Sequence, residues 1–145
     1  MHKIIMASHG SLAEGVYSAV RMILGECGNV SCYSLDHYET PQDILQAVTQ
    51  AVDREPENQF TILCDIKGGS VHNQLVTLCT AQRPNVRLVS GLNLNLALEL
   101  AVADESADIN ETIADAITVA KDNIQYFDSE VLSRELSQDV EGNLW

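Results

Sequence analysis

The sequence predicts an α/β fold with an open, mainly parallel sheet, strand order 2-1-3-4, and helices on both faces. Short apolar runs alternate with amphipathic stretches, as expected where each strand is followed by a helix. The runs are continuously apolar, which is typical of strands buried on both sides. The chain of 145 residues shows no internal repeat and no linker, so we expect a single domain.

The first half of the chain is expected to hold two strand–helix units. Residues 4–7 form an apolar run, and residues 11–24 follow with apolar side chains on one helical face until the stop at Gly25. Residues 30–35 form a weaker, partly polar run. Thr40 and Pro41 then supply a cap residue and a proline at the first helical position, which predicts the start of the second helix.

The second half repeats this order. Residues 60–64 form the third run, and a glycine pair leads into a helix over 70–81 that Arg83-Pro84-Asn85 ends. Residues 86–89 form the fourth run, followed by a helix with leucines at 94, 96, 98 and 100. A last helix is expected over 110–123, and the final twenty residues are acidic and poorly patterned.

Charge and composition exclude several classes of protein. The net charge is −13: residues 1–100 hold ten acids and six bases (net −4), and residues 101–145 hold eleven acids and two bases (net −9). This balance repels nucleic acid and anionic membranes. No stretch approaches the roughly 20 apolar residues of a membrane span, and the first run is too short for a signal peptide. We therefore expect a cytoplasmic protein, with reduced cysteines and no zinc site because no C-x-x-C is present.

The chemistry is expected just after the first and third runs. In an open parallel sheet, ligands bind beyond the carboxyl ends of the strands, where the strand order reverses. Ser8, His9 and Gly10 follow the first run, and Asp65 follows the third. With the order 2-1-3-4 these two strands are neighbours, so the imidazole and the carboxylate should come within hydrogen-bond reach.

An imidazole beside a carboxylate and two helix N-termini suits phosphoryl transfer. The carboxylate accepts the N–H of one ring nitrogen, and the other nitrogen keeps its lone pair to attack phosphorus. Free N–H groups at the helix starts and flexible glycines would hold the phosphoryl oxygens. We predict His9 as phosphoryl acceptor and Asp65 as the group that orients it, with no metal and no cofactor. The predicted phosphate-binding residues are Gly10, Ser11, Gly68, Gly69 and Ser70, and the predicted rim or partner-contact residues are Ser8, Lys67, His72 and Asn93.

Three segments resemble the mannose family (mannose/fructose/sorbose type) of phosphotransferase system (PTS) enzyme IIA components. They are Ser8-His9-Gly10, the Asp-x-x-Gly-Gly-Ser segment at 65–70 and the Gly-x-Asn-Leu segment at 91–94, in the family's order. The resemblance covers about residues 1–125. It implies a single IIA domain over 1–145, with a core of about 1–125 and a C-terminal extension of about 126–145.

The resemblance also implies partners. His9 would accept phosphate from phospho-HPr and pass it to a histidine of enzyme IIB during sugar uptake, with the membrane components IIC and IID served indirectly. Members are homodimers in which a C-terminal strand can be exchanged, and residues 124–127 are the candidate here. Val71 and Asn95 stand where the family often has proline, and residues 133–145 resemble no segment of the family.

Three other readings compete with this one. A dihydroxyacetone kinase phosphotransferase subunit would use the same histidine chemistry with another acceptor. A serine hydrolase using Ser70, His9 and Asp65 lacks the G-x-S-x-G elbow, because His72 stands where that motif needs glycine. A non-catalytic binding module of similar fold would carry no phosphate on its histidine.

Overall fold

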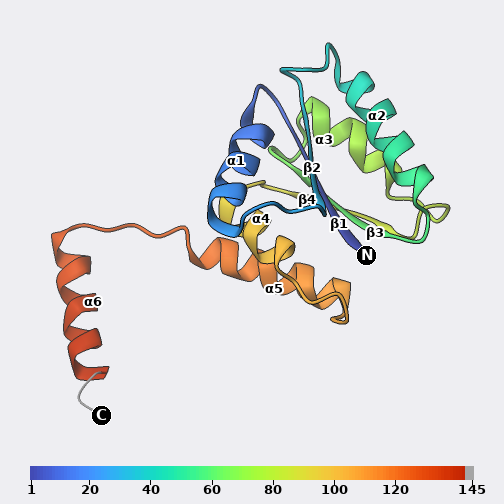
Figure 1. Cartoon of the computed structure of the whole chain (residues 1–145). Coiled ribbons are helices and arrows are strands. Elements are labelled where there is room, and N and C mark those ends of the chain that lie inside the picture. Colours follow the sequence, from blue (N-terminus) through green and yellow to red (C-terminus); the bar gives the residue numbers. More distant parts are fainter. Residues whose placement is uncertain (143–145) are drawn as a thin grey trace.

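A four-stranded parallel sheet forms the centre of the molecule (Figure 1). The computed structural model describes the backbone of residues 1–142 and the side chains of residues 1–138. The strand order is β2-β1-β3-β4, so the predicted order is confirmed. The strands are β1 (His2–Ser8), β2 (Val30–Ser34), β3 (Gln59–Cys64) and β4 (Val86–Ser90).

Helices cover both faces of this sheet, as predicted (Figure 1). On one face pack α1 (Leu12–Leu24), α4 (Leu94–Ala101) and α5 (Ile109–Asp122), where Met6 and Leu63 point into the core. On the other face pack α2 (Pro41–Arg54) and α3 (Ser70–Leu75), against Ile5 and Ile62. Neighbouring strand residues therefore serve opposite cores, which explains why the central strands β1 and β3 carry continuous apolar runs rather than alternating ones.

The two helices that follow β1 and β2 begin in different ways. Thr40 and Asp43 form a capping box at α2: the Thr40 hydroxyl accepts from the Asp43 N–H, and the Asp43 carboxylate accepts from the Thr40 N–H. Ser11 precedes α1 but makes no side-chain cap. Instead the buried hydroxyl of Ser8 accepts from the Ala13 N–H at 2.7 Å. The end of β1 is thereby tied directly to the start of α1.

Two expectations about helices are wrong. The helix expected over 70–81 ends early, with α3 stopping at Leu75 and a single 3₁₀ turn over Val76–Leu78, where the β-branched Val76 and Thr77 disfavour further α-helix. The tail expected to be poorly patterned forms α6 (Ser129–Gly142). Asp128 starts this helix, because its carboxylate accepts from the Val131 N–H at 2.9 Å.

The segment before α6 adopts neither strand nor helix at residues 124–128. It carries α6 away from the body of the molecule (Figure 1). The last three residues of the predicted extension 126–145 lie outside the described residues. In the part of the chain that the structure describes, no helix has both the length and the apolar character that a bilayer crossing requires.

The cap at α1 yields a stability prediction. Ser8→Ala should lower the free energy of unfolding by about 1–2 kcal/mol, because the buried Ala13 N–H loses its acceptor. Ser11→Ala is the matched control and should change it by less than about 0.5 kcal/mol, since the Ser11 side chain caps nothing. Urea denaturation measures both, and equal midpoints for the two variants would contradict this assignment of the cap.

Candidate functional site

His9 and Asp65 meet at the carboxyl edge of the sheet, as predicted from the strand order. The register of β1 and β3 pairs Ala7 with Cys64, so both loops leave the sheet side by side. The Nδ1 atom of His9 lies 2.9 Å from Oδ2 of Asp65, and the His9 backbone N–H donates to the same oxygen at 2.8 Å. The other carboxylate oxygen accepts from the Ile66 N–H at 2.9 Å. Asp65 is thus held at both oxygens.

The two side chains differ in exposure: the carboxylate of Asp65 is buried, and the ring of His9 is accessible. The Asp65 side chain is 5% exposed, whereas that of His9 is 42% exposed. Burial by itself would raise the pKa of Asp65, but the hydrogen bonds from the backbone and ring of His9 outweigh it and hold the pKa below its ordinary value. The carboxylate is therefore ionised and accepts the Nδ1–H, which leaves the lone pair on Nε2.

Ser70 faces that second ring nitrogen. Its hydroxyl oxygen lies 3.1 Å from Nε2 of His9, and because Nε2 carries no proton in this tautomer, the hydroxyl donates. Ser70 is exposed and is the first residue of α3. Nε2 therefore lies in an exposed contact with one hydroxyl beside it.

The glycines of the third loop shape the site around the ring. A Cβ at Gly69 would lie 3.2 Å from Cε1 of His9 and 3.3 Å from the Ile66 carbonyl oxygen, so any side chain there would press on the imidazole. Gly68 has φ +78°, a conformation that favours glycine. Their N–H groups donate within the loop, from Gly68 to Nδ1 of His72 at 3.3 Å and from Gly69 to the Ile66 carbonyl at 3.1 Å.

The first loop also needs a glycine, since Gly10 has φ +50° and is exposed. Ser11 follows it and is exposed at the start of α1. The predicted phosphate-binding residues thus fall into two groups. Gly10, Ser11 and Ser70 are exposed near His9. The N–H groups of Gly68 and Gly69 are already bonded inside their loop.

The four predicted rim residues differ in what they do. Ser8 is buried and holds α1, and His72 accepts from the Gly68 N–H. Asn93 caps α4, because its side-chain oxygen accepts from the Leu96 N–H at 2.9 Å. Lys67 is exposed on the loop beside the site. Only Lys67 presents a charge to an approaching molecule.

One contact near the site was not anticipated. The Nε2 atom of His37, from the loop after β2, lies 2.5 Å from a carboxylate oxygen of Glu14 on α1. With Asp36 these groups place one potential ligand atom each within 4.8 Å of one another. All three side chains are at least partly exposed, as solvated surface carboxylates commonly are, so we assign them no metal. The signal in the sequence was the Asp36-His37 pair directly after the second apolar run.

The cysteines do not contribute to the site. Cys64 is buried at the end of β3, where burial and then the Asp65 charge raise its pKa to about 12, so the thiol stays protonated. Cys79, in contrast, is exposed. All four cysteines are free, as expected.

The chain thus has a parallel α/β fold with a histidine after β1 that is hydrogen-bonded to a carboxylate after β3. Comparisons with known proteins point to a family with this fold. The family model described as PTS system fructose IIA component matches residues 3–117. The sorbose-specific EIIA component of Klebsiella pneumoniae is 34% identical over 96 residues, covering 66% of this chain and 70% of that protein.

Solved structures agree with this. A sugar phosphotransferase system permease from Klebsiella pneumoniae is 33% identical, with a TM-score of 0.76 over 90% of this chain and 93% of the other. The mannose/sorbose-specific IIA subunit from Enterococcus faecalis is 25% identical, with a TM-score of 0.77 over 87% and 94%. The chain therefore belongs to the mannose/fructose/sorbose family of PTS enzyme IIA components. Its role is that of a phosphoryl carrier in sugar uptake, which in general involves HPr and enzyme IIB.

The close approach at Gly69 gives a prediction for the geometry of the site. Gly69→Ala should displace the His9 ring, because the new methyl group would meet Cε1 at 3.2 Å. The ring nitrogen chemical shifts of His9, measured by NMR, should change as the Nδ1–Asp65 hydrogen bond lengthens.

Gly15→Ala is the matched control. A Cβ at this helical position meets nothing within 4 Å, so the His9 shifts should stay unchanged while stability rises by about 1 kcal/mol. Identical His9 spectra for the two variants would show that Gly69 does not position the ring.

Proposed function

We propose that His9 carries the phosphoryl group on Nε2, taking it from the phosphohistidine of HPr and passing it to a histidine of enzyme IIB. The observation that carries this proposal is the hydrogen bond between Nδ1 and Asp65, which leaves Nε2 with its lone pair on the exposed side of the ring. Membership in the IIA family supports the reaction class.

The transfer follows from this geometry. The Nε2 lone pair forms the new bond to phosphorus as the bond between phosphorus and the donor's ring nitrogen breaks, so no proton or cofactor enters the balance. The His9 ring gains positive character, which the ionised Asp65 stabilises across the 2.9 Å hydrogen bond. The second transfer, to enzyme IIB, is the same step with His9 as donor.

The groups around Nε2 would hold the phosphoryl oxygens. The Ser70 hydroxyl, 3.1 Å from Nε2, can turn its proton to an oxygen of the bound group. The backbone at Gly10 and Ser11 lies at the N-terminus of the thirteen-residue α1, where N–H groups and the helix dipole favour an anion. We infer that Gly68 and Gly69 act by shaping the loop and that Lys67 contacts the partner.

We further propose one domain over 1–145 that acts in the cytoplasm as a homodimer. Ile124, Tyr126 and Phe127 are 76%, 74% and 52% exposed on a segment without regular structure, and β4 pairs with a strand on one side only. Exchange of residues 124–127 between two chains would cover these side chains. Light scattering should give the mass of two chains, and the mass of one chain would contradict the exchange.

Phosphorylation should depend on His9. Incubation with phosphoenolpyruvate, enzyme I and HPr should label the wild type with phosphate that mild acid removes, as expected for a phosphohistidine. His9→Ala should take up no label, because the accepting nitrogen is gone, whereas His37→Ala is the matched control and should be labelled normally. Mass spectrometry after each incubation measures the label.

Two results would contradict this assignment. Label on His9→Ala would place the acceptor elsewhere. Hydrolysis of a chromogenic ester that is lost in Ser70→Ala would favour a serine hydrolase, for which Ser70, His9 and Asp65 also have a suitable arrangement.

Asp65 should affect the rate rather than the presence of the label. In Asp65→Asn the amide no longer enforces the tautomer or stabilises the charged ring, so phosphoryl transfer from HPr should slow by about 10- to 100-fold. Asp53→Asn is the control, since Asp53 lies on the surface of α2 and pairs with Arg83. Rapid-quench measurements compare the two, and equal rates would remove Asp65 from the mechanism.

A further inference from the structure

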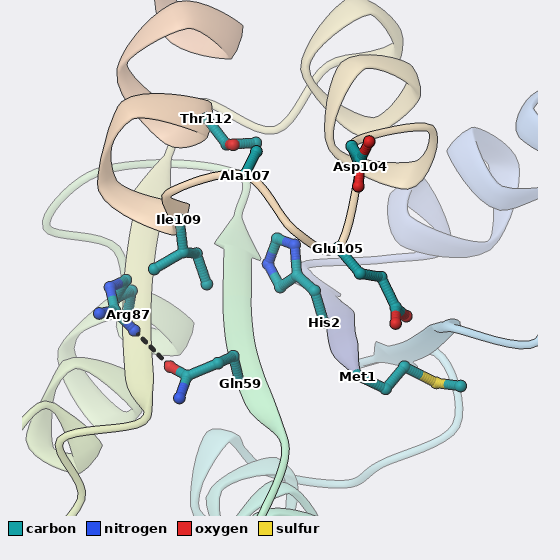
Figure 2. A pocket seen from close by; sticks show the side chains of 9 residues that line it. All are labelled: Met1, His2, Gln59, Arg87, Asp104, Glu105, Ala107, Ile109 and Thr112. Carbon is teal, nitrogen blue, oxygen red and sulfur yellow. Dashed lines mark hydrogen bonds between the residues drawn. The ribbon is translucent and has the colours of Figure 1, made fainter.

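A cavity opens at the amino ends of the strands, at the opposite end of the sheet from His9. It has a volume of about 330 Å³, which falls within the range of small-molecule sites. The starts of β1, β3 and β4 form one side, and the segment leading into α5 forms the other (Figure 2). The seven residues of β1 put about 20 Å between this cavity and the His9 site.

Arg87 provides the positive charge in this cavity. Its Nε donates to the side-chain oxygen of Asn110 and its Nη1 to that of Gln59, each at 2.8 Å (Figure 2 shows the second bond). Both acceptors are neutral amides. Within residues 1–138, the basic side chains that contact a carboxylate are those of Lys3, Arg83, His9 and His37, and Arg87 is not among them. In a chain with 21 acids and 8 bases, this guanidinium is fixed in direction by neutral groups and meets none of the carboxylates of residues 1–138.

His2 stands in the middle of the cavity. Its Nε2 lies 2.7 Å from the hydroxyl of the buried Thr61, which fixes the ring. Its Nδ1 has no hydrogen-bond partner among the side chains of residues 1–138. Figure 2 shows the ring between the strand that carries Gln59 and the side chain of Glu105. Burial, followed by the charge of Arg87, lowers the pKa of His2. The imidazole is therefore neutral near pH 7 and offers a polar ring atom rather than a second charge.

The rim of the cavity opposite Arg87 is acidic, since Asp104 and Glu105 lie there. Glu105 is exposed and lies across the His2 ring from Arg87 (Figure 2). Asp104 uses one carboxylate oxygen to accept from the Ser106 N–H and hydroxyl, each at 2.8 Å. Thr112 adds a half-buried hydroxyl from α5. Carboxylates accept hydrogen bonds from hydroxyl groups and repel a second anion, so this rim selects an uncharged, hydroxyl-rich end.

We propose that this cavity binds a sugar phosphate, with the phosphate at Arg87 and the sugar hydroxyl groups at Glu105 and Asp104. A guanidinium keeps its charge at all relevant pH values and hydrogen-bonds strongly to phosphate. With Nε and Nη1 donating to Asn110 and Gln59, the Nη2 group of Arg87 is the donor that would hold the phosphate. Ile109 offers an apolar surface beside His2 against which a sugar ring can lie (Figure 2). The site shares no residue with the His9 centre, and its occupancy does not depend on the proposed phosphoryl transfer.

Binding should be tested on the full chain by NMR titration with glucose 6-phosphate, inorganic phosphate and glucose. Glucose 6-phosphate should shift the amide signals of Gln59, Arg87 and Thr112, inorganic phosphate should bind more weakly, and glucose should not bind. Arg87→Gln should weaken glucose 6-phosphate binding by at least about tenfold. Arg83→Gln is the matched control and should leave it unchanged, because Arg83 pairs with Asp53 outside the cavity.

A second variant tests the sugar end of the ligand independently of the phosphate end. It also keeps the test valid if Arg87→Gln fails to fold. Glu105→Ala, at an exposed position, should weaken glucose 6-phosphate by about threefold or more while leaving inorganic phosphate unaffected. Signal changes confined to Gly10, Ser11 and Ser70 would assign the phosphate to the His9 site and overturn the proposal. Equal affinities of the two arginine variants for glucose 6-phosphate would also overturn it.

Discussion

The parallel pairing of β1 with β3 is the constraint on which the rest of the site depends. His9 and Asp65 are 56 positions apart in sequence, and they meet only because Ala7 and Cys64 are partners in the sheet. The pairing also brings the His9 backbone N–H to the same carboxylate oxygen that the ring contacts. One buried acid therefore joins the first and third loops and directs the ring outward.

The polar residues around the site divide into those that hold the loops and helices and those that stay accessible. The polar groups of Ser8, His72 and Asn93 accept hydrogen bonds that cap a helix or hold a turn. The glycines at 68 and 69 give the third loop its shape and leave room for the imidazole. What remains accessible is the ring nitrogen and the Ser70 hydroxyl. This arrangement suits the proposed mechanism, in which the donor and the acceptor are both proteins that dock onto the same atom of an exposed ring.

The sheet presents different chemistry at its two ends. At the carboxyl ends of the strands, an imidazole is paired with a carboxylate and lies beside the start of α1. At the amino ends, Arg87 is held by two neutral amides opposite an acidic rim. In a chain of net charge −13, this guanidinium bonds to neutral groups rather than to a carboxylate of residues 1–138, which supports the proposed phosphate site.

The sequence by itself determined the layered α/β architecture, the strands and most helix starts, because apolar periodicity and cap residues such as Thr40 and Pro41 act locally. It also predicted that His9 and Asp65 meet, since strand order decides which loops are neighbours. Only the tertiary structure decided that Ser8 rather than Ser11 holds α1, that the Gly68 and Gly69 N–H groups are used inside their loop, and that His37 pairs with Glu14. These outcomes depend on the directions in which donors and side chains point once separate segments have packed, and no local pattern encodes those directions.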